Sequence, residues 1–317
     1  MKVLLTGSAG FIGLHLARKL LKNGYEVFGV DNLNDYYDTN LKKDRLNILQ
    51  SYEMFNFKKA DIADRDQISE VFKKFQPEKV VNLAAQAGVR YSIINPYAYM
   101  NSNLVGFLNI LELCRHNNTE GLIYASSSSV YGDSNQKPFN VDDRADQPIS
   151  LYGATKRSNE LIAHSYSKLY KIRTTGLRFF TVYGSWYRPD MAMHIFAKKI
   201  LNNEPINVFN NGKMKRDFTF IDDIIEGTVA AIEKNYPCEI FNLGNNNSEN
   251  LMDVISLIEN SLGLKAKINF KPMQQGDVLE TYANIEYSRQ KLGFQPKTNI
   301  DIGVKHFTDW FRSYYDI

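Results

Sequence analysis

The sequence has only two cysteines, and their positions argue against a disulfide framework and against a metal site. Cys114 and Cys238 lie in apolar stretches, and neither has a partner at the spacing that metal ligands require. We therefore expect two reduced core residues in a cytoplasmic protein, and we expect no bound metal.

Long apolar runs and blocks of like charge are also missing. No run approaches the length of a membrane span, and residues 1–5 lead into an apolar strand without the layout of a signal peptide. The net charge of the 317 residues is only +3, and no basic stripe carries interleaved aromatic residues. These absences argue against a membrane protein and against a nucleic-acid partner. A mildly positive chain remains compatible with an anionic small substrate.

What the sequence does contain is enough apolar material for a large core. Hydrophobic residues make up 44% of the chain, which predicts one big domain or two lobes.

Near the N-terminus, residues 2–6 form an expected strand and residues 14–23 an expected helix, with Gly7, Gly10 and Gly13 between them. Glycines at this spacing let the backbone approach a pyrophosphate closely, at a helix N-terminus whose free N–H groups attract anions.

Asp31 follows a second expected strand over residues 26–30. A carboxylate at this point can accept hydrogen bonds from both ribose hydroxyls and repels a 2′-phosphate, so it favours NAD over NADP. A glycine-rich turn alone is a weak signal. Combined with the flanking strands, the helix and Asp31, it predicts a dinucleotide site.

The alternation of strands and helices continues along the chain, which predicts an α/β fold with a doubly wound parallel sheet. At the strand ends, Asp61 can meet the adenine, and the small residues Ala84 and Ala85 leave room for the nicotinamide ribose. We expect most of the polar residues in 34–50 to form a solvated loop and helix. The further expected strands are 55–60, 79–83, 121–125 and 174–180, and the further expected helices are 65–75 and 97–117.

A serine run followed by Tyr-x-x-x-Lys is the chemical centre of the sequence. If a helix begins near Tyr152, this side chain and Lys156 point off one face of it. The ammonium and an oxidised nicotinamide would favour the phenolate, which makes Tyr152 a candidate general base. Taken alone, this pair is more often a helix-surface feature. The dinucleotide signature is what favours the catalytic interpretation.

These motifs together resemble an extended short-chain dehydrogenase/reductase of the kind that modifies nucleotide sugars. The resemblance rests on Gly7-x-x-Gly10-x-x-Gly13, residues 82–85, Asn103 and the Tyr152/Lys156 pair. Within that superfamily, residues 31–38, 126–132 and 178–191 are most similar to UDP-glucuronate 4-epimerases.

The resemblance implies a tightly held NAD, a UDP-sugar on the C-terminal lobe and a homodimer formed through the helices that hold Asn103 and Tyr152. It implies Tyr152, Lys156 and Ser127 as the catalytic set. The implied cofactor-binding residues are Gly7, Gly10, Phe11, Ile12, Gly13, Asp31, Asn32, Asp61, Ile62, Leu83, Ala84, Ala85, Asn103, Ser126, Tyr152, Lys156 and Phe179. The implied substrate-binding residues are Ser127, Ser128, Ser129, Arg90, Tyr152, Thr181, Arg188, Val208, Arg216 and Asp277.

The serine stretch separates this chain from two neighbouring subfamilies. Glucose 4,6-dehydratases carry an Asp-Glu pair where Ser128 and Ser129 stand, and UDP-glucuronate decarboxylases commonly carry Glu at the position of Ser129. Neither carboxylate is present here. The expected reaction is therefore a reversible C4 epimerisation, in which NAD takes hydride from C4 and returns it to the other face of a 4-keto sugar.

A uronate substrate adds the risk of decarboxylation, because its C4 ketone and its carboxylate form a β-keto acid. Arg188, with Ser128 and Ser129, is our candidate clamp for the carboxylate, and the alternative is a structural ion pair of Arg188. Arg90 is a further candidate for phosphate or carboxylate. By resemblance Arg216 contacts the diphosphate, with a surface ion pair to Asp217 or Asp222 as the alternative.

The resemblance also suggests how the chain is divided. We expect an NAD-binding Rossmann domain over residues 1–180, with a returning segment at about 217–245, and an α/β substrate lobe over residues 181–317.

Two other functions stay open. One is C4 epimerisation of neutral or N-acetylated UDP-hexoses, which would not need Arg188, and the other is a non-catalytic, cofactor-sensing module of the same fold.

Overall fold

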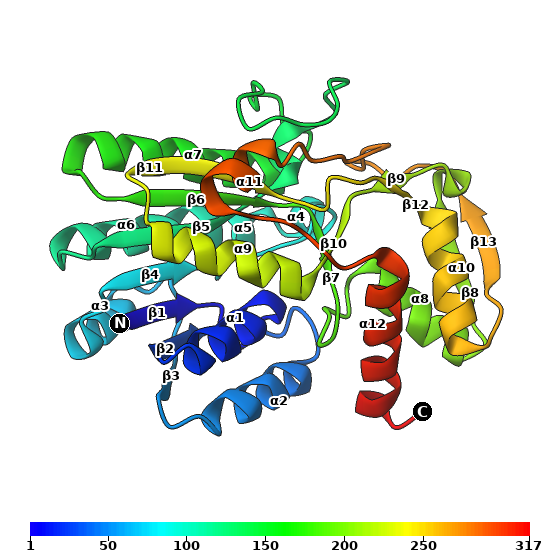
Figure 1. Cartoon of the computed structure of the whole chain (residues 1–317), viewed down its shortest axis with the longest axis horizontal. Coiled ribbons are helices and arrows are strands. Elements are labelled where there is room, and N and C mark those ends of the chain that lie inside the picture. The colour runs from blue at the N-terminus through cyan, green and yellow to red at the C-terminus, as the bar shows by residue number, and fades with distance from the viewer.

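A seven-stranded parallel sheet forms the larger part of the computed structural model, which describes residues 1–317 (Figure 1). The strand order is β11-β6-β5-β4-β1-β2-β3, and all neighbouring strands are parallel. The order turns back between β1 and β4, so the predicted doubly wound α/β fold is confirmed. The strands are β1 (Lys2–Thr6), β2 (Glu26–Asp31), β3 (Phe55–Lys59), β4 (Lys79–Asn82), β5 (Gly121–Ser127), β6 (Thr174–Phe179) and β11 (Cys238–Leu243).

Helices cover both faces of this sheet, as a parallel sheet requires. One group packs together as α1, α2 and α9, and the other as α3, α6 and α7. Buried apolar side chains form two clusters, and the larger of them extends from the sheet into the C-terminal third of the chain. The helices are α1 (Phe11–Lys22), α2 (Thr39–Gln50), α3 (Arg65–Phe75), α6 (Gly106–His116), α7 (Leu151–Tyr170) and α9 (Ile221–Lys234).

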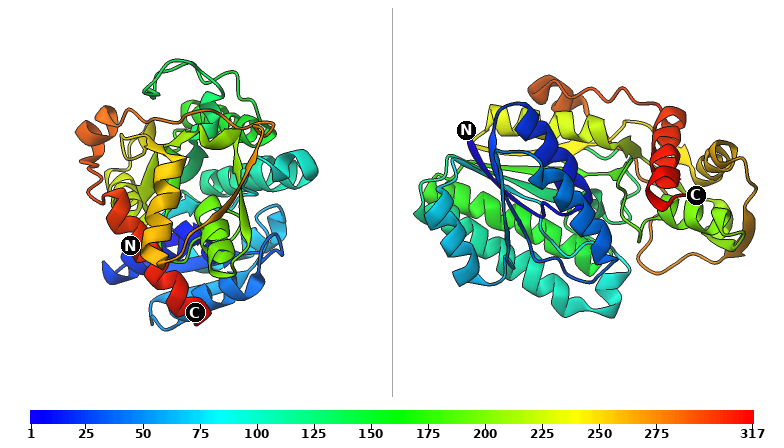
Figure 2. Two further views of the ribbon diagram at one scale, coloured as in Figure 1. Left: turned by 90° about the vertical axis from the view of Figure 1, so that its right-hand side faces the viewer. Right: turned by 90° about the horizontal axis from the view of Figure 1, so that it is seen from below.

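A smaller lobe stands at the carboxyl end of the sheet (Figures 1 and 2). Its core is the parallel pair of β8 (Pro205–Phe209) and β13 (Lys267–Lys271), with α8 (Ala192–Leu201), α10 (Leu251–Leu262) and α12 (Ile300–Tyr315) beside it. Two small strand pairs lie between the two parts: β7 (Thr181–Tyr183) with β10 (Phe218–Phe220), and β9 (Lys215–Arg216) with β12 (Glu249–Asn250). A short helix, α11 (Glu286–Leu292), lies on the large sheet.

The chain passes repeatedly between the two parts. After the smaller lobe has begun, the segment holding α9 and β11 returns to the large sheet, where β11 pairs with β6. The chain then leaves again into α10 and β13, and α11 packs back against α9 and β11. Neither part is therefore made from one continuous stretch of sequence. None of the helices has the length and hydrophobicity that crossing a bilayer would need.

The expected helix over residues 97–117 is helical throughout but is not a regular α-helix. It is made of α5 (Pro96–Tyr99), a π-helical segment at Met100–Val105 and α6, and a short helix α4 (Tyr91–Ile94) precedes it. Gly106 ends the π segment where a side chain would collide with Ile62, because a Cβ there would lie 2.6 Å from Ile62 Cγ1. This close approach joins residues far apart in the sequence, so the local sequence pattern does not reveal it.

The expectation that most polar residues of 34–50 are solvated does not extend to two of the charged ones. Arg45 is fully buried and Lys42 is 5% exposed. Arg45 donates to the carbonyl oxygen of Ala9 at 3.1 Å and to that of Trp186 at 2.6 Å. Its partners come from sequence positions far away, so the local pattern of polar residues could not indicate its burial.

His194 on α8 helps to attach the C-terminal helix α12. Its Nε2 lies 3.0 Å from the hydroxyl of Tyr315, and its ring packs edge-on against Phe311 at 4.9 Å between centroids. The side chain is 2% exposed, and this burial, helped by the positive charges of Lys198 and Arg45, lowers the pKa of His194 to about 4. The folded protein therefore holds this histidine neutral.

We predict that acid destabilises the protein partly through His194. The unfolded chain binds a proton here near pH 6.5, but the folded chain does not until about pH 4, so stability is lost as the pH falls between these values. The loss at pH 5 should be ~2 kcal/mol of the free energy of unfolding. Urea unfolding of wild type and His194→Gln at pH 7.5 and pH 5 measures it. The variant should lose less stability than wild type, and an equal loss in both would contradict the prediction.

Candidate active site

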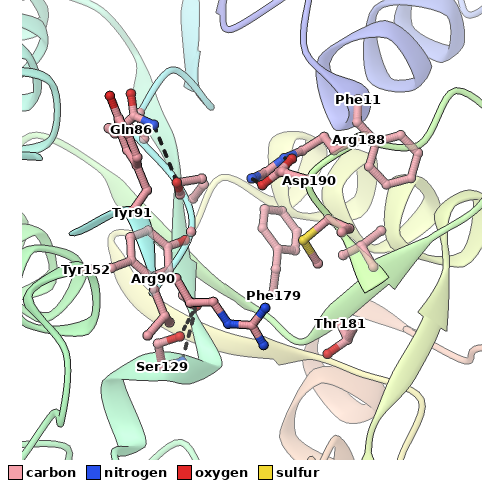
Figure 3. A pocket seen from close by; sticks show the side chains of 18 of the residues that line it. Phe11, Gln86, Arg90, Tyr91, Ser129, Tyr152, Phe179, Thr181, Arg188 and Asp190 are labelled. Atoms are coloured by element: carbon pink, nitrogen blue, oxygen red, sulfur yellow. Dashed lines mark hydrogen bonds and ion pairs between the residues drawn. The ribbon is translucent and has the colours of Figure 1, made fainter. Parts of the chain in front are cut away.

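A cavity of about 760 Å³ lies between the carboxyl edge of the sheet and the smaller lobe (Figure 3). The turn after β1, the ends of β2, β4, β5 and β6, and residues of the smaller lobe line it. Pockets for small molecules and cofactors have volumes of roughly 300–1,000 Å³. In a doubly wound sheet this edge is also where ligands bind.

The glycine turn leaves no room for side chains at the floor of the cavity. Gly7 has a φ of +74°, and a Cβ there would lie 2.8 Å from the backbone nitrogen of Ala84. A Cβ on Gly13 would lie 2.0 Å from the carbonyl oxygen of Gly7. Gly10 provides no side-chain cap for α1, and Phe11 and Ile12 in its first turn line the cavity. This end of α1 therefore fits the pyrophosphate of a dinucleotide.

Asp31 stands at the end of β2, where the sequence predicts the ribose contact. Its carboxylate accepts hydrogen bonds from the backbone nitrogens of Ala9 at 3.2 Å and Leu33 at 2.9 Å, and it lines the cavity. Burial raises the pKa of Asp31. The lone pairs that remain on its oxygens fit the two ribose hydroxyls of NAD. Asp61 stands behind the lining, where it accepts a hydrogen bond from the Asn32 side-chain amide at 2.9 Å.

The serine run and the Tyr152/Lys156 pair meet at the carboxyl end of β5. Ser150 begins α7 by accepting a hydrogen bond from the backbone nitrogen of Gly153 at 3.0 Å. This cap fixes the first turn of the helix, so both Tyr152 and Lys156 line the cavity. The Lys156 ammonium donates to the carbonyl oxygen of Ala125 at 3.0 Å and lies 6.0 Å from the centre of the Tyr152 ring.

Burial is the largest influence on the pKa values of this pair. Burial raises the pKa of Tyr152, against the opposing effects of the Ser127 hydroxyl and the Arg188 guanidinium. Burial also lowers the pKa of Lys156 to about 8. Within this chain, Arg188 is a cation that favours the Tyr152 phenolate against the effect of burial. Lys156 points instead to the strand end, where a cofactor ribose would lie.

A buried ion pair holds α7 against the sheet. The carboxylate of Glu160 accepts from Arg178 on β6 at 2.8 and 2.9 Å, and from the hydroxyl of Ser126 on β5 at 2.6 Å. It also accepts from Arg157 at 2.7 Å. The charge of Glu160 is thus fully compensated, and the helix that carries Tyr152 is fixed to the strand that carries the serines.

Asn103 lies outside the lining of the cavity. Its side-chain amide pairs with the backbone of Gln86, accepting from the nitrogen at 2.8 Å and donating to the oxygen at 3.0 Å. It also donates to the hydroxyl of Thr155 at 3.0 Å. Asn103 therefore positions the loop after β4 against α7, and it makes no direct contact with the space where a cofactor would lie.

The arginines of the cavity are arranged in different ways. Arg188 forms a two-pronged ion pair with Asp190, which is the alternative that the sequence left open. Arg90 pairs with Asp277 at 3.2 Å across the two parts of the molecule. Arg216 forms no ion pair with an acid, so the alternative of a pair with Asp217 or Asp222 is wrong, and its side chain lines the cavity.

The expected substrate contact of Val208 is not found. Val208 is fully buried in the core of the smaller lobe, and its neighbours on β8, Asn207 and Phe209, line the cavity in its place. Alternate side chains of a strand point to opposite faces, so the expectation was displaced by one residue.

Of the residues predicted from the sequence, those that line the cavity are Gly7, Gly10, Phe11, Ile12, Gly13, Asp31, Asn32, Ile62, Leu83, Ala84, Ala85, Arg90, Ser126, Ser127, Ser128, Ser129, Tyr152, Lys156, Phe179, Thr181, Arg188, Arg216 and Asp277.

Sequence reasoning missed a group of aromatic residues in this site. Tyr36 and Tyr91 line the cavity and pack on each other with ring centroids 4.6 Å apart, and Tyr91 is visible beside Tyr152 in Figure 3. The available signal was that Tyr36 lies five residues after Asp31, in the segment that follows the predicted ribose contact.

Comparison with known proteins gives a consistent result. Residues 3–244 match the family described as the NAD dependent epimerase/dehydratase family. The probable UDP-glucuronate 4-epimerase of Rhizobium meliloti is 42% identical over 99% of this chain and 98% of its own. Protein CapI of Staphylococcus aureus is 52% identical over 99% of both chains. The crystal structure of UDP-glucuronic acid 4-epimerase from Bacillus cereus, in complex with UDP-glucuronic acid and NAD, superposes with a TM-score of 0.94 at 37% identity, over 99% of this chain and 100% of that one.

We predict that Gly13→Ala removes bound NAD. The new methyl group would lie 2.0 Å from the Gly7 carbonyl oxygen, so the turn that fits a pyrophosphate must move. NAD released by denaturing the purified variant, measured against wild type, tests this. Thermal unfolding shows whether the variant is folded. A folded variant that keeps wild-type levels of NAD would contradict the prediction.

Proposed function

Because this chain belongs to the NAD dependent epimerase/dehydratase family, we propose that it interconverts UDP-glucuronate and UDP-galacturonate by inversion at C4. It is an NAD-dependent epimerase. The observation that carries the substrate assignment is the arrangement at Tyr152. The phenol lies beside Ser127, no carboxylate stands in the serine stretch, and an arginine faces the same space.

In the proposed mechanism, Tyr152 moves the proton and the other residues orient the sugar. Bound NAD supplies the reversible oxidation of C4. Tyr152 accepts the proton of the 4-hydroxyl and returns it after the sugar has presented the opposite face of C4, while Ser127 holds the same oxygen. Arg188 is the nearby cation that favours the phenolate needed for the first step. Lys156 is placed to bind the cofactor ribose.

The substrate side of the cavity provides groups for each part of a UDP-uronate. Arg216 and Arg90 can hold the diphosphate, because a guanidinium makes paired, charge-assisted hydrogen bonds to phosphate oxygens. Asp277 can accept from the uridine ribose. Arg188, with Ser128 and Ser129, can hold the uronate carboxylate, which must be kept from leaving as carbon dioxide once C4 is a ketone.

The assay uses purified protein and UDP-glucuronate without added cofactor. We expect UDP-galacturonate to form, and NAD to be released when the protein is denatured. Tyr152→Phe should reduce turnover by at least ~10²-fold, the contribution expected of a general base, while keeping its NAD. A product that lacks the carboxyl carbon, or turnover of UDP-glucose alone, would contradict the substrate assignment. An active Tyr152→Phe variant would contradict the assignment of the base.

We also propose a homodimer, a cytoplasmic location and the two-lobed division given above, 1–180 with about 217–245 and 181–317. The two cysteines are unpaired, which suits a reducing compartment.

The dimer is supported by apolar side chains on the neighbouring elements from α4 to α7. They include Ile94 at 77% exposed, Leu161 at 55% and Leu108 at 42%. Exposed apolar side chains on neighbouring helices are typical of interaction surfaces.

We predict a particle of twice 36.4 kDa in light scattering. The double variant Leu108→Arg, Leu161→Arg should give the single-chain mass, because it places charges in the proposed interface. Leu264→Arg is the matched control, since Leu264 is 44% exposed but lies after α10 in the smaller lobe. A single-chain mass for wild type would contradict the dimer.

A further inference from the structure

Arg188 is held in one orientation by a carboxylate of its own chain. Its Nε donates to Asp190 Oδ1 at 3.0 Å and its Nη2 to Asp190 Oδ2 at 2.5 Å. This pairing occupies one edge of the guanidinium, and Nη1 makes no hydrogen bond. The two side chains are 22% and 21% exposed, and they lie together across the open space from Tyr152 in Figure 3.

Asp190 is in turn held by Tyr36, whose hydroxyl donates to Asp190 Oδ2 at 3.2 Å. The ring of Tyr36 packs on Tyr91, and a Cβ on Gly88 would lie 2.9 Å from its hydroxyl. Burial, together with the charge of Asp190, raises the pKa of Tyr36 to about 12. Tyr36 therefore remains a hydrogen-bond donor at any pH at which the protein functions. The position of Asp190 is thus determined from two sides, by Arg188 and by Tyr36.

The position of Tyr36 is fixed by the loop that leaves the predicted ribose contact. Asp31 accepts from the backbone nitrogen of Leu33 at 2.9 Å, Asn32 from that of Asn34 at 3.1 Å, and Asn34 from that of Tyr36 at 3.4 Å. These successive side-chain turns form a continuous connection from Asp31 to Tyr36. The cofactor side of the cavity therefore reaches across to the substrate side.

The next residue fastens the other end of the same segment. The hydroxyl of Tyr37 accepts from Arg45 at 2.8 Å, and Arg45 donates to the carbonyl oxygen of Trp186 at 2.6 Å. Tyr36 and Tyr37 thus hold residues 186–190 at both ends. Arg188 lies between these two attachments, so its backbone and its guanidinium are both constrained.

We propose that Tyr36 and Asp190 are positioning residues that fix Arg188 with its Nη1 edge toward the sugar and thereby give the site its selectivity for a uronate. This inference rests on the proposed function, because it concerns the sugar carboxylate. A freely rotating arginine would lose side-chain entropy when it binds substrate, and Asp190 removes that cost before the substrate arrives. Asp190 also offsets the charge of Arg188. The site thus recognises a carboxylate through directed N–H groups more than through net positive charge.

The test uses the complete enzyme with Asp190→Asn and Tyr36→Phe. The measured quantity is the ratio of kcat/KM for UDP-glucuronate to kcat/KM for UDP-glucose, together with the share of turnovers that release carbon dioxide. Asp309→Asn and Tyr52→Phe are matched controls. Asp309 makes only an exposed pair with Lys305, Tyr52 makes no side-chain hydrogen bond, and neither residue lines the cavity.

We expect the ratio to fall about tenfold in Asp190→Asn and about threefold in Tyr36→Phe, with KM for UDP-glucuronate carrying most of the change. Decarboxylated product should increase in both variants. A merely structural role would lower kcat/KM for both sugars equally and leave the ratio unchanged, and that result overturns the inference. If Asp190→Asn does not fold, Tyr36→Phe, which removes one hydroxyl, decides alone. Failure of wild type to act on UDP-glucuronate would remove the proposed function, and this inference with it, before any variant is made.

Discussion

The hydrogen bonds of the buried Glu160 carboxylate are the interactions on which the geometry of the site depends. The carboxylate is buried where α7, β5 and β6 meet, and its two oxygens take hydrogen bonds from Arg178, Arg157 and Ser126. A charge in this position is tolerated only because each oxygen is satisfied, and removal of one partner of such a pair typically costs about 3–5 kcal/mol. The same network sets the distance between the helix that carries Tyr152 and the strand that carries Ser127. Stability and chemistry therefore share one set of bonds.

Much of the fold could be predicted from the sequence because its signals are local. The alternation of apolar strands with apolar-faced helices can be read without distant information, and α3 begins and ends where the pattern predicts. The start of α1 was expected three residues too late, at Leu14, because Gly10 acts as the cap without a polar side chain. The π-helical segment before Gly106 has no counterpart in the periodicity of the apolar residues.

The residues of the site fall into the same two groups, those that a local motif predicts and those that depend on distant contacts. Residues whose position follows from a strand end or a helix start, such as Asp31, Ser127 and Tyr152, lie in the cavity as expected from their motifs. Residues whose role depends on a partner far along the chain could not be assigned. Arg45 has the polar neighbours of a solvated helix, yet it is buried because carbonyl oxygens of Ala9 and Trp186 surround it. Each of these contacts joins segments that only the tertiary fold brings together.

The route of the chain has a consequence for how enzymes of this architecture can be altered. Because α9 and β11 return to the large sheet between two visits to the smaller lobe, no single cut separates the nucleotide-binding part from the substrate-binding part. A chimera with its crossover at residue 180 would pair β6 of one parent with β11 of the other, and a crossover between β10 and β12 would divide the pair of β9 and β12. New sugar preferences are thus more accessible to individual substitutions around the cavity than to the exchange of whole lobes by recombination.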